Sequence, residues 1–358
     1  MKAILIRAHG STDALLIEDR PIFRPSRSGR RGASHDRTPG RFRQARAEGN
    51  VMRWRSAVIA AVALIGLAGS VASGRTLPRP PAIVRVFPLD CGRIDIADMD
   101  AFADDGSYKG VTKQLVVSCY LIRHPKGDLL WDAGIGDQFA GPSGVTLLPG
   151  YVAHVPVTLA AQLRRLGTRL DRVQYLAFSH EHVDHIGNAN ALTQATWLLN
   201  MREHRWTIAH DGRNGHPPAL LARAEQAKVV PVTADRDVFG DGSVRIVQAP
   251  GHTPGHQVLF VRPTGARPLI LAGDLWHSRA NYDHDSVPRI NSSRAQTLAS
   301  MAKVRRLAAS TGAQIVISHA PEDFHPASDQ PGEVPRSGEA RSRSHQAPSA
   351  PGGAAWPG

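Results

Sequence analysis

The chain has 358 residues, of which 42% are hydrophobic, and a formal net charge of +12 at pH 7. This length and apolar content can support a sizeable globular core. Most of the excess positive charge lies in residues 1–56, and the rest of the chain has no long Lys/Arg run. The composition therefore argues against a nucleic-acid-binding surface in the body of the chain.

The sequence of the first 51 residues is not typical of a folded domain. Residues 1–22 resemble the opening strands of the medium-chain quinone reductase and alcohol dehydrogenase family, but no Gly-rich dinucleotide loop follows. Residues 23–50 are rich in Arg, Ser and Gly and have almost no apolar side chains to bury. We interpret residues 1–51 as a non-native or disordered extension, outside the natural protein if translation starts later.

Residues 52–74 have the layout of a secretory signal peptide. Arg53 and Arg55 precede an apolar run, and small residues follow it. The run is shorter than the roughly 20 residues that span a bilayer, so we expect no stable membrane span. If translation starts near Met52, we expect a periplasmic or secreted protein, and otherwise a cytoplasmic one.

The two cysteines, Cys91 and Cys119, are too few for a disulfide scaffold or a Cys-rich zinc site. The sequence leaves open whether they are two buried thiols or one structural disulfide of an exported protein.

Residues 82–326 are predicted to form one domain of alternating strands and helices. Short runs rich in Val, Ile and Leu predict strands at 115–122, 128–131, 173–178, 244–248, 258–261, 269–271 and 315–317. Helices are predicted at 157–166, at 219–228, and after Ser292 and Ser293 as N-cap candidates, with Gly312 as the stop. This alternation predicts a layered α/β fold. Residues 327–358 are dominated by Pro, Gly, Ser and Arg, and we expect a disordered tail.

The segment SHEHVDHIGN, residues 179–188, concentrates ligand-type side chains directly after a predicted strand. His180 and His182 alternate and can face one ion, while Asp184 and His185 can face a second. Imidazole and carboxylate suit zinc and similar divalent ions. We therefore expect two metal ions.

This H-x-H-x-D-H run resembles the signature of the metallo-β-lactamase superfamily, and later motifs match in order: APGHTPGHQ, LAGDLWH and VISHAPED. The resemblance implies a four-layer αββα sandwich made of two similar halves. It implies that one ion is held by His180, His182 and His252, that the other is held by Asp184, His185 and His319, and that Asp274 bridges them. Asp132, in WDAGIG, is implied to orient a ligand.

The expected chemistry is hydrolysis of an ester-like or lactone bond by a metal-bound hydroxide. Two Zn²⁺ ions, or other divalent transition metals, would lower the pKa of a shared water. Asp184 is expected to act catalytically by receiving the proton. The expected partner is a small-molecule substrate, and the oligomeric state cannot be read from the sequence.

The sequence around the expected ligands resembles that of N-acyl homoserine lactonases most closely, so such lactones are the favoured substrate. Those enzymes commonly have a Tyr three residues after the bridging Asp, where this chain has His277. Either His277 supplies the corresponding hydrogen bond as a catalytic residue, or the substrate differs. The alternatives are an exported two-zinc β-lactamase-like β-lactam hydrolase and a thioester hydrolase. Of the remaining histidines, His256 is expected to pack between loop and strand, and three are expected to face solvent: His204, His210 and His216.

Overall fold

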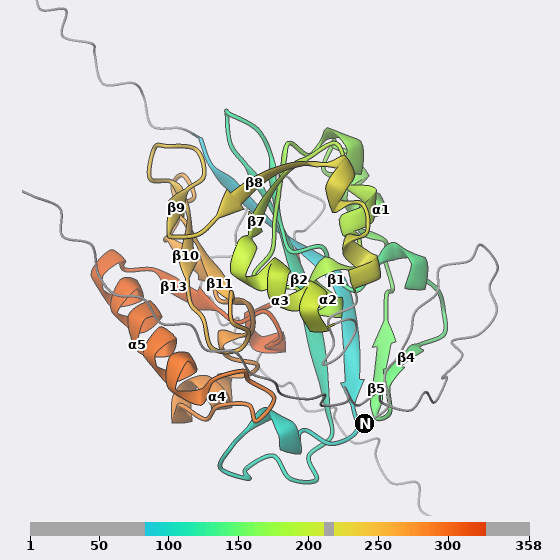
Figure 1. Ribbon diagram of the computed structural model, residues 1–358, viewed down its shortest axis with the longest axis vertical. Helices are drawn as coiled ribbons and strands as arrows, with labels where there is room; N and C mark the ends of the chain where they lie inside the picture. The colour runs from blue at the N-terminus through green and yellow to red at the C-terminus, as the bar shows by residue number, and fades with distance from the viewer. Residues whose placement is uncertain (1–82, 211–217, 327–358) are drawn as a thin grey trace, which may run out of the picture. The chain divides into compact units, whose positions relative to one another are not determined.

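The computed structural model describes residues 83–210 and 218–326, which form two sheets covered by helices (Figure 1). The predictions made for residues 1–51, 52–74 and 327–358 lie outside the described residues, as does His216. No helix in the described part of the chain has both the length and the apolar character needed to cross a membrane.

The larger sheet has eight strands in the order β4-β5-β1-β2-β3-β6-β7-β8. Its members are β4 (Val145–Leu148), β5 (Tyr151–His154), β1 (Arg85–Ile96), β2 (Lys113–Arg123), β3 (Leu129–Trp131), β6 (Tyr175–Ala177), β7 (Thr196–Asn200) and β8 (Lys228–Val232). Strands β3, β6, β7 and β8 run parallel to one another, so their carboxyl ends meet at one edge of the sheet.

The smaller sheet has five strands in the order β13-β12-β11-β10-β9. They are β13 (Gln314–Val316), β12 (Leu269–Leu271), β11 (Gln257–Val261), β10 (Val244–Gln248) and β9 (Arg236–Asp237). Because β11 is antiparallel to both of its neighbours and β13 is parallel to β12, strands β10, β12 and β13 all point the same way. The loops that follow these three strands therefore leave the sheet at the same edge.

Five α-helices flank the sheets: α1 (Leu159–Arg165), α2 (Val183–Ile186), α3 (Met201–His210), α4 (Arg279–His284) and α5 (Arg294–Thr311). Helices α4 and α5 lie beside the smaller sheet, and α1, α2 and α3 lie toward the other side of the molecule (Figure 1).

Three buried apolar clusters separate the layers. One joins the larger sheet to α1 through Leu159 and Leu163. The second lies between the sheets and joins Ile122 of β2 with Leu259 of β11. The third joins the smaller sheet to α5 through Val304. Each sheet thus buries both faces, as a four-layer sandwich requires, and the predicted αββα fold is confirmed. The two sheets are nevertheless unequal, with eight strands against five.

Most predicted elements are present, with ends shifted by a few residues. Each of the seven predicted strands overlaps one of the observed strands. Helix α5 begins after the N-cap Ser293, whose side chain accepts a hydrogen bond from the Gln296 amide, and ends at Gly312 in the left-handed conformation.

The helix predicted at 219–228 is wrong. Two short 3-10 turns, Pro218–Leu221 and Ala224–Gln226, occupy this segment, and β8 begins at Lys228. Parallel pairing of β8 with β7 satisfies the backbone from Lys228 onward, so tertiary pairing overrides the local helical pattern.

The first strand, β1, was not predicted, although it is the longest in the larger sheet. Pro88 and Gly92 interrupt its sequence pattern, and its pairing with β2 shifts register between Asp90 and Arg93. Strand β1 also carries Cys91, which forms a disulfide with Cys119 of β2. Of the two states that the sequence left open for these cysteines, the structure therefore has the disulfide.

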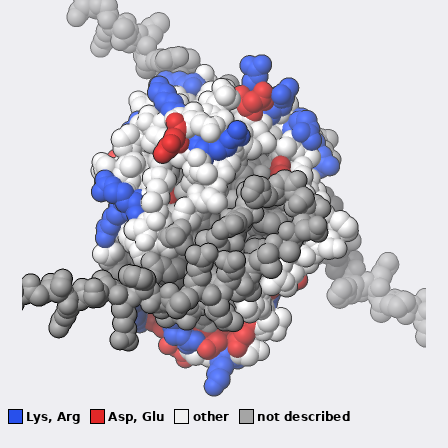
Figure 2. Space-filling model, turned by 45° about the vertical axis from the view of Figure 1, so that its right-hand side comes forward, with Lys and Arg blue, Asp and Glu red and all other residues white. Residues whose placement is uncertain are grey.

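The visible described surface carries Lys and Arg in small groups, several of them beside Asp or Glu (Figure 2).

Candidate metal centre

The seven predicted ligands lie together at the ends of strands from both sheets. His180 and His182 follow β6, and α2 places Asp184 and His185 directly after them. The other three side chains follow strands of the smaller sheet: His252 after β10, Asp274 after β12 and His319 after β13. All seven lie in two groups whose ligand atoms are within 4.8 Å of one another.

Three imidazoles of the first group point their nitrogens at one another. His180 Nε2 lies 2.7 Å from His182 Nδ1, and His252 Nε2 lies 3.2 Å and 3.0 Å from these two atoms. The Asp274 Oδ2 atom approaches from the fourth side, 3.6 Å from His180 Nε2 and 3.5 Å from His252 Nε2. Four donors thus converge on one point, as a tetrahedral divalent ion requires.

The second group shares the same aspartate. Asp274 Oδ1 lies 3.1 Å from His185 Nε2 and 3.1 Å from His319 Nε2. Asp184 Oδ2 completes the group at 3.8 Å from His185 Nε2 and 3.5 Å from His319 Nε2. The two oxygens of Asp274 therefore face different groups, which is the geometry of a bridging carboxylate.

These side chains fit a pair of divalent cations. Asp274 Oδ1 and His185 Nε2 are buried and have no hydrogen-bond partner in the described part of the chain. Leaving such polar atoms without a partner is costly, and a cation between them would satisfy both. The donor set is imidazole and carboxylate, which zinc and related ions prefer.

Hydrogen bonds on the far side of the rings orient them. His252 Nδ1 donates to Asn291 Oδ1 at 2.8 Å, and His319 Nδ1 donates to the Val116 carbonyl at 2.7 Å. His185 Nδ1 donates to Asp132 Oδ2 at 3.1 Å. Each bond keeps the proton on Nδ1 and leaves Nε2 as the ligand atom. Asp132 thus contacts one of the expected ligands, as the orienting role implied for it requires.

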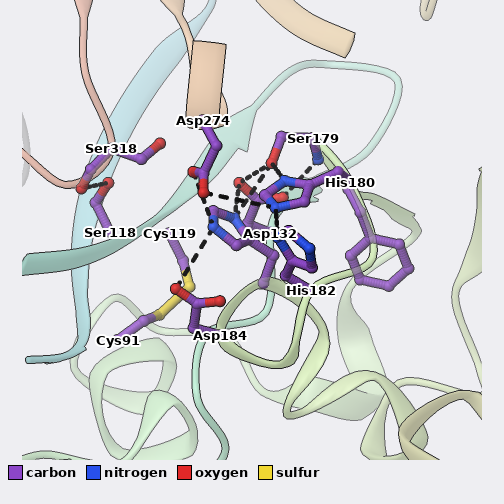
Figure 3. A network of polar contacts seen from close by, with 12 residues as sticks. Cys91, Ser118, Cys119, Asp132, Ser179, His180, His182, Asp184, Asp274 and Ser318 are labelled. Atoms are coloured by element: carbon purple, nitrogen blue, oxygen red, sulfur yellow. Dashed lines mark hydrogen bonds and ion pairs between the residues drawn. A yellow bond between two sulfur atoms is a disulfide. The ribbon is translucent and has the colours of Figure 1, made fainter. Parts of the chain in front are cut away.

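Asp132 is itself held in place by the first ligand loop. Its Oδ1 accepts a hydrogen bond from the Ser179 amide at 2.6 Å, and its Oδ2 accepts one from Ser179 Oγ at 3.0 Å (Figure 3). The residue has a φ of 61°, a conformation that Asp and Asn tolerate better than most side chains. Asp132 therefore connects His185 to the loop that carries His180.

Burial and neighbouring charges set the protonation of the centre. Burial lowers the pKa of His180 well below its usual range and lowers the pKa of His252 to about 4. Burial also acts to lower the pKa of His185, but Asp274, Asp132 and Asp184 outweigh it and raise that pKa. Burial acts to raise the pKa of Asp274, but His319 and His185 outweigh it and lower that pKa well below normal. Asp274 is thus an ionised carboxylate among imidazoles.

His277 and His256 both contact Asp274, on different sides. His277 Nε2 lies 3.1 Å from Asp274 Oδ2, and its buried Nδ1 has no hydrogen-bond partner within the described ranges. His256 Nδ1 donates to the Ala249 carbonyl, and its Nε2 accepts the Asp274 amide at 3.0 Å. The packing role expected for His256 is confirmed, and this residue also fixes the backbone of the bridging aspartate.

Two expectations on the outer histidines are wrong. His204 and His210 were expected to face solvent, but both are half-buried on α3. His204 Nδ1 lies 3.3 Å from Glu181 Oε2, and His210 Nδ1 bonds to the Trp206 carbonyl at 2.7 Å. His204 is covered where α3 packs beside the ligand loop, whereas His210 is covered by Trp206 of its own helix, and a sequence of mixed polarity does not reveal either contact.

Two supporting residues were missed, Asn291 and Glu203. Asn291 lies in a loop with no motif, so no sequence signal marks it. Glu203 follows Asn200 by three residues, which is the spacing of a helix N-terminal capping box. That signal predicts a helix start but not a contact with the ligand loops.

Comparison with known proteins matches the chain to one family. The family model described as "Metallo-beta-lactamase superfamily" matches residues 112–319. Among curated proteins, the N-acyl homoserine lactonase AttM of Azorhizobium caulinodans is 29% identical over 262 residues, covering 70% of this chain and 98% of that protein. The N-acyl homoserine lactonase AiiA of Bacillus thuringiensis subsp. kurstaki is 27% identical over 191 residues, covering 50% of this chain and 71% of that protein.

Solved structures agree on the fold. An N-acyl homoserine lactone hydrolase, with the product N-hexanoyl-L-homoserine at its catalytic metal centre, superposes with a TM-score of 0.59 at 21% identity. The match covers 67% of this chain and 95% of that one. The dizinc quorum-quenching lactonase AidC gives a TM-score of 0.50 at 23% identity, covering 66% of this chain and 88% of that one.

Proposed function

Since the chain belongs to the metallo-beta-lactamase superfamily, we propose that it is a dinuclear metal-dependent hydrolase that opens a lactone ring, with N-acyl homoserine lactones as the substrate class. The observation that carries this proposal is Asp274, whose Oδ1 and Oδ2 face two separate groups of imidazoles. The lactone substrate is supported by the names of the curated relatives, AttM and AiiA.

We propose zinc as the metal in both positions, held by His180, His182 and His252 on one side and by Asp184, His185 and His319 on the other. Two such ions would supply a water of lowered pKa and a Lewis acid for the substrate carbonyl. The support is the imidazole-rich donor set and the dizinc character of AidC.

Asp184 is proposed to move the proton. Its side chain is 12% exposed, whereas those of Asp274 and His319 are 4% and 2% exposed. A carboxylate at the solvent side of the centre can take a proton at its oxygen and release it to water. His319 Nε2 lies 3.5 Å from Asp184 Oδ2, so an ion held by both atoms would keep that carboxylate turned toward the centre.

His277 is proposed to contact the substrate. In a neutral imidazole one nitrogen donates and the other accepts. If Nε2 donates to Asp274 Oδ2, then the Nδ1 atom is an acceptor. It would suit the amide N–H of an acyl side chain better than a carbonyl oxygen. This arrangement replaces the tyrosine hydroxyl of the lactonases and predicts an altered acyl preference.

The test is a substrate panel on protein of measured metal content. Ring opening of N-acyl homoserine lactones is followed by acid release, with nitrocefin in parallel for the β-lactam alternative. We expect lactone turnover, and we expect His277→Ala to lower kcat/KM by up to about 10-fold, because it removes one hydrogen-bond acceptor for the substrate, worth about 0.5–1.5 kcal/mol. The control is His284→Ala, because His284 is exposed on α4. Nitrocefin turnover without lactone turnover would overturn the substrate assignment.

We also propose that the protein is exported, with residues 52–74 as the signal. The Cys91–Cys119 disulfide supports this proposal, because disulfides persist mainly in oxidising compartments. Mass spectrometry of the mature N-terminus tests it: cleavage near residue 74 is expected, and an uncleaved cytosolic protein would contradict it.

A further inference from the structure

A buried glutamate outside the seven ligands joins two of the ligand loops. Glu203 lies in the first turn of α3 and is 1% exposed. Its Oε1 accepts a hydrogen bond from the Glu181 amide at 3.2 Å, and its Oε2 accepts one from the Gly255 amide at 2.8 Å. Glu181 stands between His180 and His182, and Gly255 lies three residues after His252. One carboxylate therefore bridges the loops that carry all three imidazoles of the first group.

Close packing fixes where this carboxylate lies. A Cβ atom at Gly255 would fall 2.5 Å from the Glu203 amide nitrogen and 2.6 Å from the Glu203 Cβ, so only glycine lets the loop approach α3 this closely. Asn200 Oδ1 accepts the amides of Arg202 and Glu203 at 3.0 Å and 3.2 Å, which locks the start of the helix. The glutamate thus projects from a rigid helix end against a loop that has no side chain there.

The Asn200 side chain extends the same connection to the smaller sheet. Its Nδ2 donates to Gln248 Oε1 at 2.8 Å, at the end of β10. Because His252 follows β10 by four residues, helix α3 is tied both to that strand and to the loop beyond it. Movement of α3 would consequently displace the loops that carry both His180 and His252.

A purely structural role explains this glutamate poorly. Burial, followed by the nearby Glu181 carboxylate, raises the pKa of Glu203 to about 7, and the hydrogen bonds from the Glu181 and Gly255 amides oppose the shift. A carboxylate is an expensive group to bury, and an apolar side chain would fill the same space at lower cost. What the carboxylate adds is two acceptors, and both are used by amides of ligand loops.

We propose that Glu203 is a positioning residue that holds the His180–His182 loop and the His252 loop at the separation required by the first metal ion. The inference rests on the proposed metal centre. It predicts that loss of Glu203 weakens one of the two ions selectively, because the second group receives no hydrogen bond from α3 among those of the described residues.

The test compares Glu203→Gln with Glu225→Gln in the full chain, by measuring zinc bound per chain in metal-buffered dialysis. Glutamine keeps the size of Glu203 but turns an NH₂ group toward one of the two amide donors. Glu225 is exposed, so the same change there is the matched control. We expect E203Q to lose one ion at about 10- to 100-fold higher free zinc than the native protein, while the other ion stays. E225Q should behave as the native protein does.

The melting temperature of the metal-free protein separates the possible outcomes. If E203Q melts earlier but binds both ions with native affinity, Glu203 is a structural residue only and the inference is overturned. If the native protein itself binds no zinc, the proposed metal centre fails first. Should E203Q not fold, Glu203→Asp keeps the charge but shortens the reach by one methylene. It is then expected to show the same selective loss, and native binding by E203D would overturn the inference.

Discussion

The two ligand groups share Asp274, but different parts of the fold hold them. In the first group, His252 is oriented by the Asn291 side chain, and the loops are joined by Glu203 of α3. In the second group, His319 is oriented by the Val116 carbonyl in β2, a strand in the middle of the larger sheet. The first group thus depends on single side chains, one in a loop and one at the start of α3, and the second depends partly on a strand backbone.

Only some of the groups that orient the ligands can be removed by substitution. A backbone carbonyl in a paired strand remains after any substitution at Val116, whereas Asn291 and Glu203 can each be deleted. Asp132 is the exception in the second group, because it is a side chain that orients His185. The two groups should therefore respond to different substitutions, and measured zinc stoichiometry can tell them apart.

The largest effect is expected for Asp274→Asn, because Asp274 belongs to both groups and its replacement should weaken the binding of both ions together. The amide keeps the size of the carboxylate but loses its charge, and each group then lacks its shared anionic donor. We expect both ions to be lost at free zinc that saturates the native protein and kcat/KM to fall by about 10³-fold or more. Elemental analysis and lactone turnover measure these effects, and retention of two ions would show that Asp274 does not bridge.

Asp132→Asn should weaken mainly the second group. Asparagine tolerates the φ of 61° and can still accept one hydrogen bond, but it binds the His185 imidazole less strongly. We expect about a 10- to 100-fold lower affinity for one ion. Because Asp132 also accepts bonds from Ser179, a smaller effect on the other ion is expected. Equal loss of both would contradict independent support of the groups.

Asn291→Ala should weaken only the first group. The His252 ring loses its Nδ1 acceptor and can rotate, so we expect about a 10-fold loss of zinc affinity for one ion. Zinc titration of the double variant N291A/D132N tests whether the two groups are supported independently. If the two substitutions act on different ions, their effects should add.

Ser293→Ala is expected to have the smallest effect, and it tests the stability of the fold while leaving the metal centre unchanged. Ser293 caps α5, so its removal should cost about 1 kcal/mol of unfolding free energy. Its backbone amide still donates to the Gly251 carbonyl beside His252, so zinc binding should not change. Denaturant unfolding measures the cost, and loss of zinc from S293A would mean that the N291A effect reflects stability alone.

Local patterns in the sequence predicted a layered α/β fold and the first ligand cluster, and the family resemblance implied the αββα sandwich and the later ligands. Short apolar runs marked the strands that precede His180, His252, Asp274 and His319, and the loops after strand ends are where a scaffold presents side chains. Helix α5 was predicted from its caps, Ser293 and Gly312. The assignment of residues 1–51 and 52–74 remains a prediction.

Elements and contacts that depend on distant partners were missed. Strand β1 is interrupted by Pro88 and Gly92 but is stabilised by pairing with β2 along most of its length. The segment at 219–228 forms two 3-10 turns and the first residue of β8, and β8 pairs in parallel with the edge of β7.

The sequence itself marked the seven expected ligands. The chemistry and spacing of residues 180–185 indicated four of them, and the resemblance of the later motifs to the metallo-β-lactamase superfamily implied His252, Asp274 and His319. Only the tertiary structure decided what holds them, since no motif marks Asn291, Glu203 or Val116 as a support of the ligand loops. These residues act through hydrogen bonds to residues that are 22 to 203 positions away. Such partners meet only after the chain has packed, and local sequence patterns do not indicate which distant residues become neighbours.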